Sequence, residues 1–261
     1  MVKASHGWTS ATPNELAEAL HAVLAQSGEA ALRHFQQVTP RKKGDGTWVT
    51  DADIEAEAII LEALQRLFPG DGLISEEGGR ANARAGHPTW YIDPIDGTGA
   101  FVEGLAHWGP TITLVQDGQF QVGAFLLPRL REFWFAQRGE GAWRDGVRLA
   151  LPPERPTHEQ SLYLPSRYHR RMPIPWRGKV RALGSSAFHL AQAAGGGADA
   201  TVIPSWEPWD IGCGVLLVTE VGRIVTNLAG AVINPLSEVG QPLLAGTPSC
   251  VAHLSERLQK G

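Results

Sequence analysis

The first third of the chain contains two segments in which apolar residues recur at helical spacing. Residues 12–15, Thr-Pro-Asn-Glu, combine a capping box with a proline at the first helical position. Apolar residues then return every three or four positions as far as Leu32, which predicts an amphipathic helix. After a polar loop, a second helix is expected to begin after Thr50, with Asp53 in its first turn.

The middle of the chain alternates short apolar runs with turn signals. Asp117-Gly118 is a strong hairpin signal between two such runs, and Asp145-Gly146 marks a further turn. This pattern predicts a largely antiparallel sheet packed against the two early helices. The expected strands are residues 72–75, 90–92, 111–115, 121–127, 133–137 and 142–143.

A proline-rich segment, residues 151–156, separates this region from a second one in which helices and strands alternate. We therefore expect an α+β protein with two subdomains, residues 1–150 and residues 151–261. The helices expected in the second subdomain are residues 186–194, 209–221 and 248–258, and its strands are residues 200–203, 224–226 and 243–245.

Composition narrows the class of protein without naming a function. The 261 residues are 43% hydrophobic and 19% charged, which excludes collagen-like, disordered and coiled-coil structures. Lys and Arg total 23 against 27 Asp and Glu, so the net charge of −4 argues against nucleic-acid binding through bulk charge. Cys213 and Cys250 match no metal-binding spacing and no disulfide framework. With no secretory pattern and no apolar run of membrane-spanning length, a soluble, cytoplasmic protein is expected.

Acidic residues stand where the predicted strands end and the predicted helices begin. Taken singly, each is typical of a turn or of a helix N-terminus. Carboxylates that converge repel one another, and divalent cations that prefer oxygen ligands, Mg²⁺ or Mn²⁺, make such convergence stable. The candidates are Asp53, Glu76, Glu77, Asp93, Asp96 and Asp210.

Several segments resemble, in order, the motifs of one known family. Residues 93–98, Asp-Pro-Ile-Asp-Gly-Thr, match the D-P-[IL]-D-G-T signature of the inositol monophosphatase family, and residues 207–210 match its late P-W-D segment. The segments similar to V-T-x-x-D, G-E-E, G-S-A-A and E-A-G-G-x-V-T are residues 48–53, 75–77, 184–187 and 220–226. The resemblance implies a Mg²⁺-dependent, lithium-sensitive phosphatase. It also implies a layered αβαβα sugar-phosphatase fold, with an antiparallel sheet in the N-terminal half and a mixed sheet in the C-terminal half.

The resemblance implies the metal ligands residue by residue. Glu76, Asp93 and the backbone carbonyl of Ile95 would hold a first Mg²⁺, and Asp93, Asp96 and Asp210 would hold a second. Glu76 would also help to place a third ion, so two or three Mg²⁺ are expected, with Mn²⁺ as a substitute. The N-terminal subdomain would then supply most of the ligands.

The remaining site residues follow from the same resemblance. Thr98 and Asp53 would orient the attacking water. Glu77 would be a supporting acid next to the metal ligands, without binding the metal itself. The backbone N–H groups of Gly97 and Thr98 would receive phosphate oxygens. The residues expected on the substrate side are Gly184, Ser185, Ser186 and Ala187. A homodimer is also expected, because it is common in this family.

Two departures from the family pattern bear on the substrate. Gly99 and Ala100 replace two polar residues of the signature, which removes the Lys-Glu pair of relatives that hydrolyse nucleotide 3′-phosphates. Many inositol phosphatases place a glutamate seven residues before the P-W-D aspartate, where it reaches sugar hydroxyls, and that position here is Ile203. Glu207 is either a substitute from the neighbouring loop or a solvated acid.

Several functions therefore remain open. A small phosphate monoester similar to inositol monophosphate is the leading substrate. Histidinol phosphate, fructose 1,6-bisphosphate and 3′-phosphoadenosine 5′-phosphate are the alternatives. A different class of function is a regulatory protein that keeps the fold and binds RNA-processing machinery. A basic run at residues 166–171 is either a solvated face or a contact for a second phosphate.

Overall fold

The computed structural model describes residues 8–44, 46–84, 86–166, 174, 176–234 and 236–259. Residues 167–171 of the basic run lie outside the described residues. Two long helices, α1 (Pro13–His34) and α2 (Asp51–Leu67), form the first layer after a short helical turn, η1 (Trp8–Ser10). Both helices begin with the capping box that the sequence predicts, at Thr12 and at Thr50. A two-stranded ribbon, β1 (Arg41–Lys42) and β2 (Trp48–Val49), joins them.

The second layer is an eight-stranded sheet in the order β10-β9-β8-β7-β6-β5-β3-β4. Its members are β3 (Gly72–Ser75), β4 (Arg80–Ala81), β5 (Thr89–Asp96), β6 (Gly109–Gln116), β7 (Gln119–Leu127), β8 (Glu132–Gln137), β9 (Gly141–Arg144) and β10 (Val147–Arg148). The prediction of a largely antiparallel sheet is confirmed, and β3 and β5 form its one parallel pair among the described strands. That pair brings the carboxyl ends of two strands together.

Strand β5 is longer than the sequence pattern indicated. We expected a strand that stops before Asp93, but β5 continues to Asp96, with a register shift against β6 between Asp93 and Asp96. Pro94 lies in that interval and has no N–H to donate to the ladder. The irregularity therefore keeps both acids on one buried strand end.

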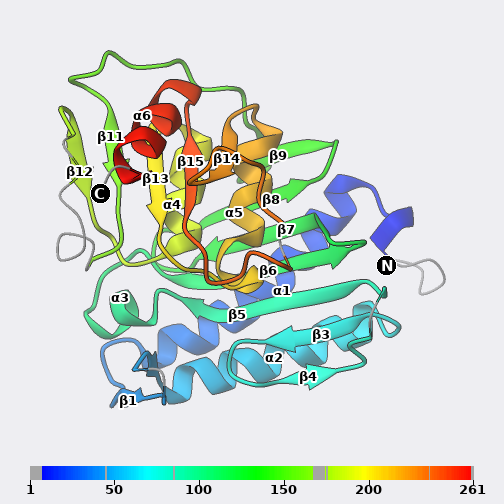
Figure 1. Cartoon of the computed structure of the whole chain (residues 1–261). Helices are drawn as coiled ribbons and strands as arrows, with labels where there is room; N and C mark the ends of the chain where they lie inside the picture. Colours follow the sequence, from blue (N-terminus) through cyan, green and yellow to red (C-terminus); the bar gives the residue numbers. More distant parts are fainter. Residues whose placement is uncertain are drawn as a thin grey trace.

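Two helices, α4 (Ser186–Gly195) and α5 (Pro208–Glu220), form the third layer, and a five-stranded sheet forms the fourth (Figure 1). The sheet order is β12-β11-β13-β15-β14, from strands β12 (Lys179–Arg181), β11 (Ser161–Tyr163), β13 (Ala200–Ile203), β15 (Leu243–Gly246) and β14 (Ile224–Asn227). Its pairs are both parallel and antiparallel. Helix α6 (Pro248–Gln259) packs outside as the fifth layer. The predicted αβαβα arrangement with a mixed second sheet is confirmed.

Helix α5 belongs to the C-terminal half of the chain yet packs on the first sheet. The backbones of α5 and β7 lie close together where Gly123 of β7 faces Cys213 of α5. A Cβ at Gly123 would lie only 2.5 Å from the Cα of Cys213, so glycine allows this packing. Cys213 is itself buried in the core that α4 and α5 share with β7 and β8. A subdomain division at residue 150 stays a prediction, since this core is continuous across it. No helix in the described ranges is long and apolar enough to cross a membrane.

Candidate metal site

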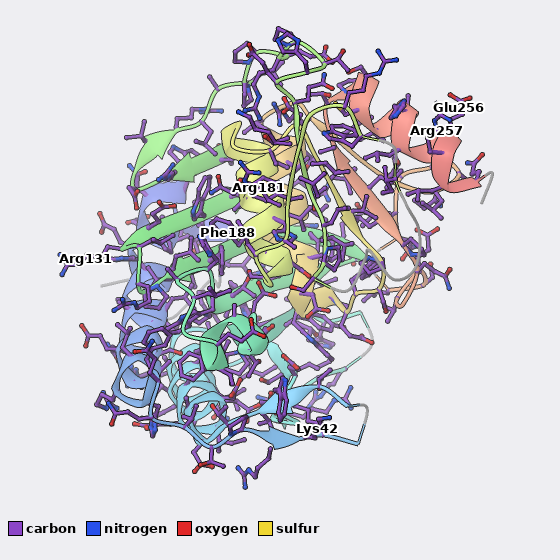
Figure 2. The ribbon with its side chains drawn as sticks, turned by 90° about the vertical axis from the view of Figure 1, so that its left-hand side faces the viewer. Lys42, Arg131, Arg181, Phe188, Glu256 and Arg257 are labelled. Atoms are coloured by element: carbon purple, nitrogen blue, oxygen red, sulfur yellow. The ribbon has the colours of Figure 1, made fainter. Side chains whose placement is uncertain are left out.

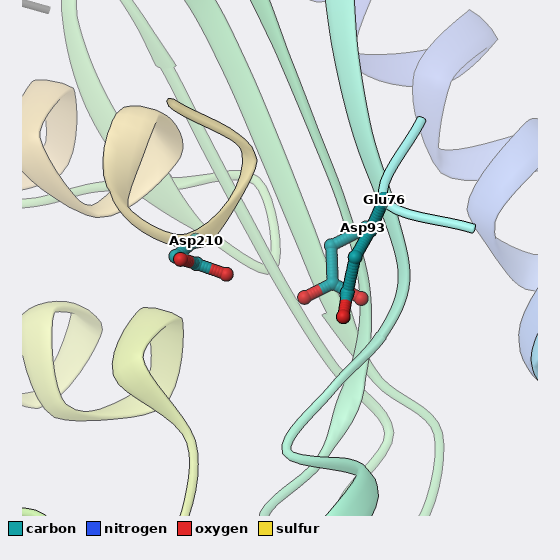
Figure 3. A group of neighbouring side chains, drawn as sticks. All are labelled: Glu76, Asp93 and Asp210. Carbon is teal, nitrogen blue, oxygen red and sulfur yellow. The ribbon is translucent and has the colours of Figure 1, made fainter. Parts of the chain in front are cut away.

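Three acids from separate parts of the chain converge beside the end of the β3–β5 pair. One carboxylate oxygen from each of Glu76, Asp93 and Asp210 lies within 4.8 Å of the others (Figure 3). Glu76 follows β3, Asp93 lies in β5, and Asp210 stands in the first turn of α5. The sequence-predicted convergence of these three residues is therefore present in the structure.

The parallel pairing explains why Glu76 and Asp93 meet. Ser75 lies opposite Ile92 in the register of β3 and β5, and the next backbone N–H, that of Glu76, donates to the carbonyl of Ile92 at 3.0 Å. Adjacent parallel strands thus deliver two acids to the same edge, the usual location of sites in such sheets. Asp93 Oδ1 accepts a hydrogen bond from the backbone N–H of Ile95 at 2.9 Å, which holds its carboxylate in place.

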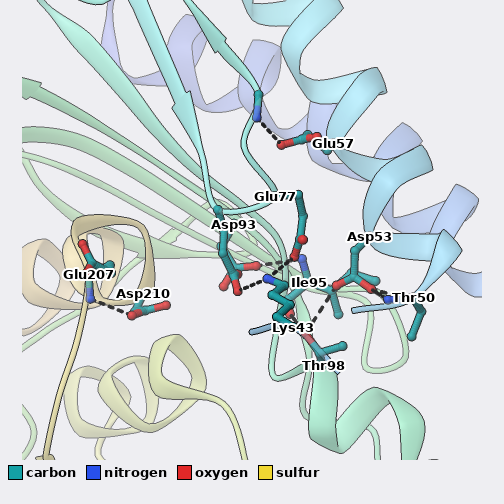
Figure 4. Close-up of polar contacts among 12 residues, drawn as sticks. Lys43, Thr50, Asp53, Glu57, Glu77, Asp93, Ile95, Thr98, Glu207 and Asp210 are labelled. Atoms are coloured by element: carbon teal, nitrogen blue, oxygen red, sulfur yellow. Dashed lines mark hydrogen bonds and ion pairs between the residues drawn. The ribbon is translucent and has the colours of Figure 1, made fainter. Parts of the chain in front are cut away.

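Two acids of this region, Asp210 and Asp53, are held by capping interactions at helix N-termini (Figure 4). Asp210 Oδ2 accepts from the backbone N–H of Glu207 at 2.7 Å, and Asp53 Oδ2 accepts from the backbone N–H of Thr50 at 2.7 Å. Each acid is the third residue of its helix, the position from which a side chain reaches back to the cap. Both carboxylates are therefore oriented by contacts within three residues of sequence.

Thr98 connects Asp53 to the strand end. Its hydroxyl lies 3.3 Å from Asp53 Oδ1 and 3.2 Å from the backbone carbonyl of Ile95, both within donating distance. Gly97, just before it, has a φ of 89°, a conformation that glycine adopts without strain. A Cβ at Gly97 would also lie 3.0 Å from Ser185 Cβ, so the turn that presents Thr98 requires glycine.

Asp96 lies in the same cavity but makes a different set of contacts. Its carboxylate accepts hydrogen bonds from the Ser185 hydroxyl, from the backbone N–H of Ser186 at 3.3 Å and from that of Ala187 at 3.0 Å. These are donors at the N-terminus of α4, where a negative charge is favourable. Three of the four residues expected on the substrate side thus bind Asp96, and a direct role for them toward substrate stays a prediction.

The convergence of acids changes their protonation. Burial and then the neighbouring carboxylates hold the pKa values of Asp93 and Asp210 well above the usual range for aspartate. Burial raises the pKa of Asp96 to about 7, against the lowering effect of its hydrogen bonds, and burial also raises the pKa of Asp53. A site of this kind requires positive charge to become fully ionised.

Lys43 also belongs to this group of charged residues, and the sequence analysis did not identify it. Lys43 Nζ lies 2.7 Å from Glu76 Oε1 and 2.6 Å from Glu77 Oε1 (Figure 4). Burial would lower the pKa of Lys43, but its bonds with the two glutamates raise it above the usual value. Burial raises the pKa of Glu77 to about 7. Lys43 sits in a polar loop with no motif, so only the fold identifies it.

A cavity of about 280 Å³ opens onto these acids. Trp48, Gly97, Thr98 and Gly184 line it together with the acids Glu76, Asp93, Asp96 and Asp210. Ile203 is not among the residues that line it; this side chain is 1% exposed and packs in the core between the sheets. Glu207 lines a neighbouring cavity with Trp209 rather than this one.

Comparisons with known proteins identify the family of this chain. A sequence model of the inositol monophosphatase family matches residues 12–260. The Thermotoga maritima fructose-1,6-bisphosphatase/inositol-1-monophosphatase is 30% identical over 224 residues, 83% of this chain and 86% of that protein. Nus factor SuhB of Vibrio cholerae is 30% identical over 211 residues, 77% of this chain and 79% of that protein. A Thermotoga maritima IMPase structure superposes with a TM-score of 0.82 at 27% identity, covering 93% of this chain and 98% of that one. The chain therefore belongs to the inositol monophosphatase family.

Proposed function

We propose that this protein is a Mg²⁺-dependent phosphomonoesterase that hydrolyses a small phosphorylated metabolite. The convergence of Glu76, Asp93 and Asp210 within 4.8 Å carries the proposal. No structural need accounts for three acids placed together, because their mutual repulsion opposes folding. A hard divalent cation removes that repulsion and matches a donor set made of carboxylate oxygens.

We infer that the acids and the Ile95 carbonyl hold more than one ion. Glu76, Asp93 and the carbonyl of Ile95 are the proposed ligands of one, and Asp93, Asp96 and Asp210 those of another. Burial, and then the neighbouring carboxylates, raise the pKa values of Asp93 and Asp210, and bound cations would offset both effects, which supports this assignment. Divalent ions held there would neutralise the phosphate ester, activate water and stabilise the leaving alkoxide.

The protein's own groups would position the reactants. The Thr98 hydroxyl, between Asp53 Oδ1 and the Ile95 carbonyl, is placed to hold a water and to pass its proton toward the Asp53 carboxylate. Asp53 is suited to accept that proton, because burial raises its pKa. Gly97 and Thr98 line the cavity, and their backbone N–H groups are the proposed phosphate contacts.

The substrate we favour is similar to inositol monophosphate, and the relatives named inositol monophosphatase support it. The buried Ile203 weakens polyol selectivity, since no carboxylate stands there to accept hydroxyl hydrogen bonds. Histidinol phosphate is therefore a serious alternative, followed by fructose 1,6-bisphosphate and 3′-phosphoadenosine 5′-phosphate. Lithium sensitivity, a homodimer and a cytoplasmic location stay predictions from the sequence.

The test is a panel of these four phosphate esters assayed for phosphate release with Mg²⁺. We expect activity on at least one, with kcat/KM ranking the substrates, and near-complete loss in Asp93→Asn. Asp51→Asn is the matched control, because that carboxylate lies at the same end of α2 as Asp53 but is 80% exposed and pairs only with Arg41 among the described residues. Equal turnover by wild type and Asp93→Asn would refute the proposal.

A second candidate function is regulatory binding to RNA-processing machinery. The relatives named Nus factor SuhB favour it, because they are 30–31% identical to this chain and the relatives named as phosphatases are 30% identical. The panel separates the two, since a protein with only this role would release no phosphate from any ester.

A further inference from the structure

A second cavity lies along α6, which packs on the face of the five-stranded sheet opposite α4 and α5. Its volume is about 550 Å³, within the usual range of small-molecule sites. Helix α6 supplies Cys250, His253 and Arg257 to its wall, and the segment before β12 supplies Trp176 and Arg177. Among the described residues, none lines both this cavity and the one that opens onto the acids. Figures 1 and 2 place α6 and Arg257 at the far end of the molecule from β1 and Lys42.

The wall of this cavity carries positive charge in a chain with a net charge of −4. Neither Arg177 nor Arg257 makes a hydrogen bond or ion pair with any residue in the described ranges. None of the described residues that line the cavity is acidic. The nearby Glu154 carboxylate is engaged by the hydroxyl of Ser249 at the rim. Two guanidinium groups without carboxylate partners beside one cavity suit an anion, which each can bind through two parallel hydrogen bonds.

An aromatic wall stands next to these arginines. Trp176 Nε1 donates to the backbone carbonyl of Gln160 at 3.2 Å, and Gln160 is itself buried. The indole meets His253 edge to face, with ring centroids 6.1 Å apart and an interplanar angle of 62°. Because the hydrogen bond to the Gln160 carbonyl satisfies the indole N–H and holds the ring in position, the indole offers a rigid surface for a flat ring.

Cys250 connects the cavity wall to the apolar core under α6. Cys250 is 2% exposed, and it packs with Leu254 and Leu258 in the core under α6. Burial raises the pKa of the Cys250 thiol, so this residue contributes an uncharged, apolar surface. The cavity therefore combines an aromatic wall with two guanidinium groups beside the core under α6.

We propose that this cavity binds an organic anion that carries an aromatic ring, of the class of a nucleoside monophosphate. The ring lies against Trp176 and His253, and the phosphate is held by Arg177 and Arg257. The site is separate from the metal site and does not depend on the proposed catalytic activity.

The test is calorimetric titration of the full-length, metal-free protein with AMP, adenosine and inorganic phosphate. Without metal, the acidic cluster repels anions, so binding reports on the arginine-lined cavity. We expect AMP to bind more tightly than either fragment, since ring and phosphate both contribute. The double variant Arg177→Gln/Arg257→Gln should weaken AMP binding by about tenfold or more, and Trp176→Leu should remove the advantage of AMP over phosphate.

Two controls locate the site. Arg66→Gln on α2 removes an exposed guanidinium far from the cavity and should leave AMP binding unchanged. Asp93→Asn, tested for AMP binding alone, should leave the affinity for AMP unchanged. Tighter binding would place AMP at the acidic cluster, because this variant removes one repelling charge there. The arginine variants are expected to fold, because neither side chain has a partner in the described structure. No AMP binding at about 5 mM, or equal affinity in the double variant, overturns the proposal.

Discussion

Replacing Asp93 by asparagine is expected to stabilise the metal-free protein while it removes the response to Mg²⁺. Asp93 is 2% exposed and shares its surroundings with Glu76 and Asp210. Its hydrogen bond from the Ile95 N–H uses Oδ1, and the amide oxygen of asparagine can accept the same bond. The substitution therefore removes one negative charge while keeping the shape and the acceptor.

The size of the effect follows from the spacing of the charges. Two unit charges 4.8 Å apart repel by about 3.5 kcal/mol at an effective dielectric constant of about 20. Partial protonation and the Lys43 ammonium on Glu76 relieve some of this repulsion, so we expect a net gain of about 2 kcal/mol. The folded-state pKa of Asp93 is raised, so the penalty grows as pH rises above the unfolded value. At about pH 8 the gain corresponds to an increase of about 4–8 °C in melting temperature.

The assay is thermal unfolding in EDTA at that pH, followed by the same scan with excess Mg²⁺. Wild type should melt at a higher temperature with Mg²⁺ than in EDTA, whereas Asp93→Asn should melt at one temperature in both. Asp51→Asn serves as the control, because this exposed acid has no converging neighbour and should show no rise in EDTA. If Asp93→Asn melts at or below the wild-type temperature in EDTA, the reasoning from charge repulsion is wrong.

Three further predictions concern the reaction, the pH dependence and the core. Thr98→Ala should lower kcat for phosphate release by about 10²–10⁴-fold, whereas Thr98→Ser, which keeps a hydroxyl, should retain most of the wild-type kcat. Near-normal turnover by the alanine variant would contradict the role of the hydroxyl. In EDTA, the melting temperature should fall as pH rises from about 4, the pKa of an unfolded carboxyl group, to about 7. The reason is that the pKa values of Glu77 and Asp96 in the folded state are raised to about 7. A melting temperature that stays flat or rises over this range would count against these shifts. Gly123→Ala should cost about 1–3 kcal/mol in urea unfolding, because the new Cβ meets the α5 backbone at 2.5 Å, whereas Gly70→Ala, with open space around it, should be neutral.

Much of the site was predictable because its residues act through local sequence. Thr50 and Asp53 form a capping box, and Asp210 stands at the equivalent position of α5, so three-residue spacing alone orients both acids. Asp93 and Asp96 were identified by their motif, although the strand was expected to stop before them. The bulge at Pro94 is a property of pairing with β6, and the sequence of β5 does not encode its partner.

The helices, the hairpins and the identity of the acids are determined by the sequence itself, since capping, turn residues and apolar spacing act over a few positions. Contacts between distant segments were decided only by the tertiary structure. Lys43 pairs with Glu76 and Glu77 across more than thirty residues, and Asp96 receives the N-terminus of α4 from about ninety residues away. The arginine-lined cavity under α6 likewise joins residues some eighty positions apart. Each depends on how the layers close on one another, because a side chain's long-range partner is set by packing and not by its neighbours in the chain.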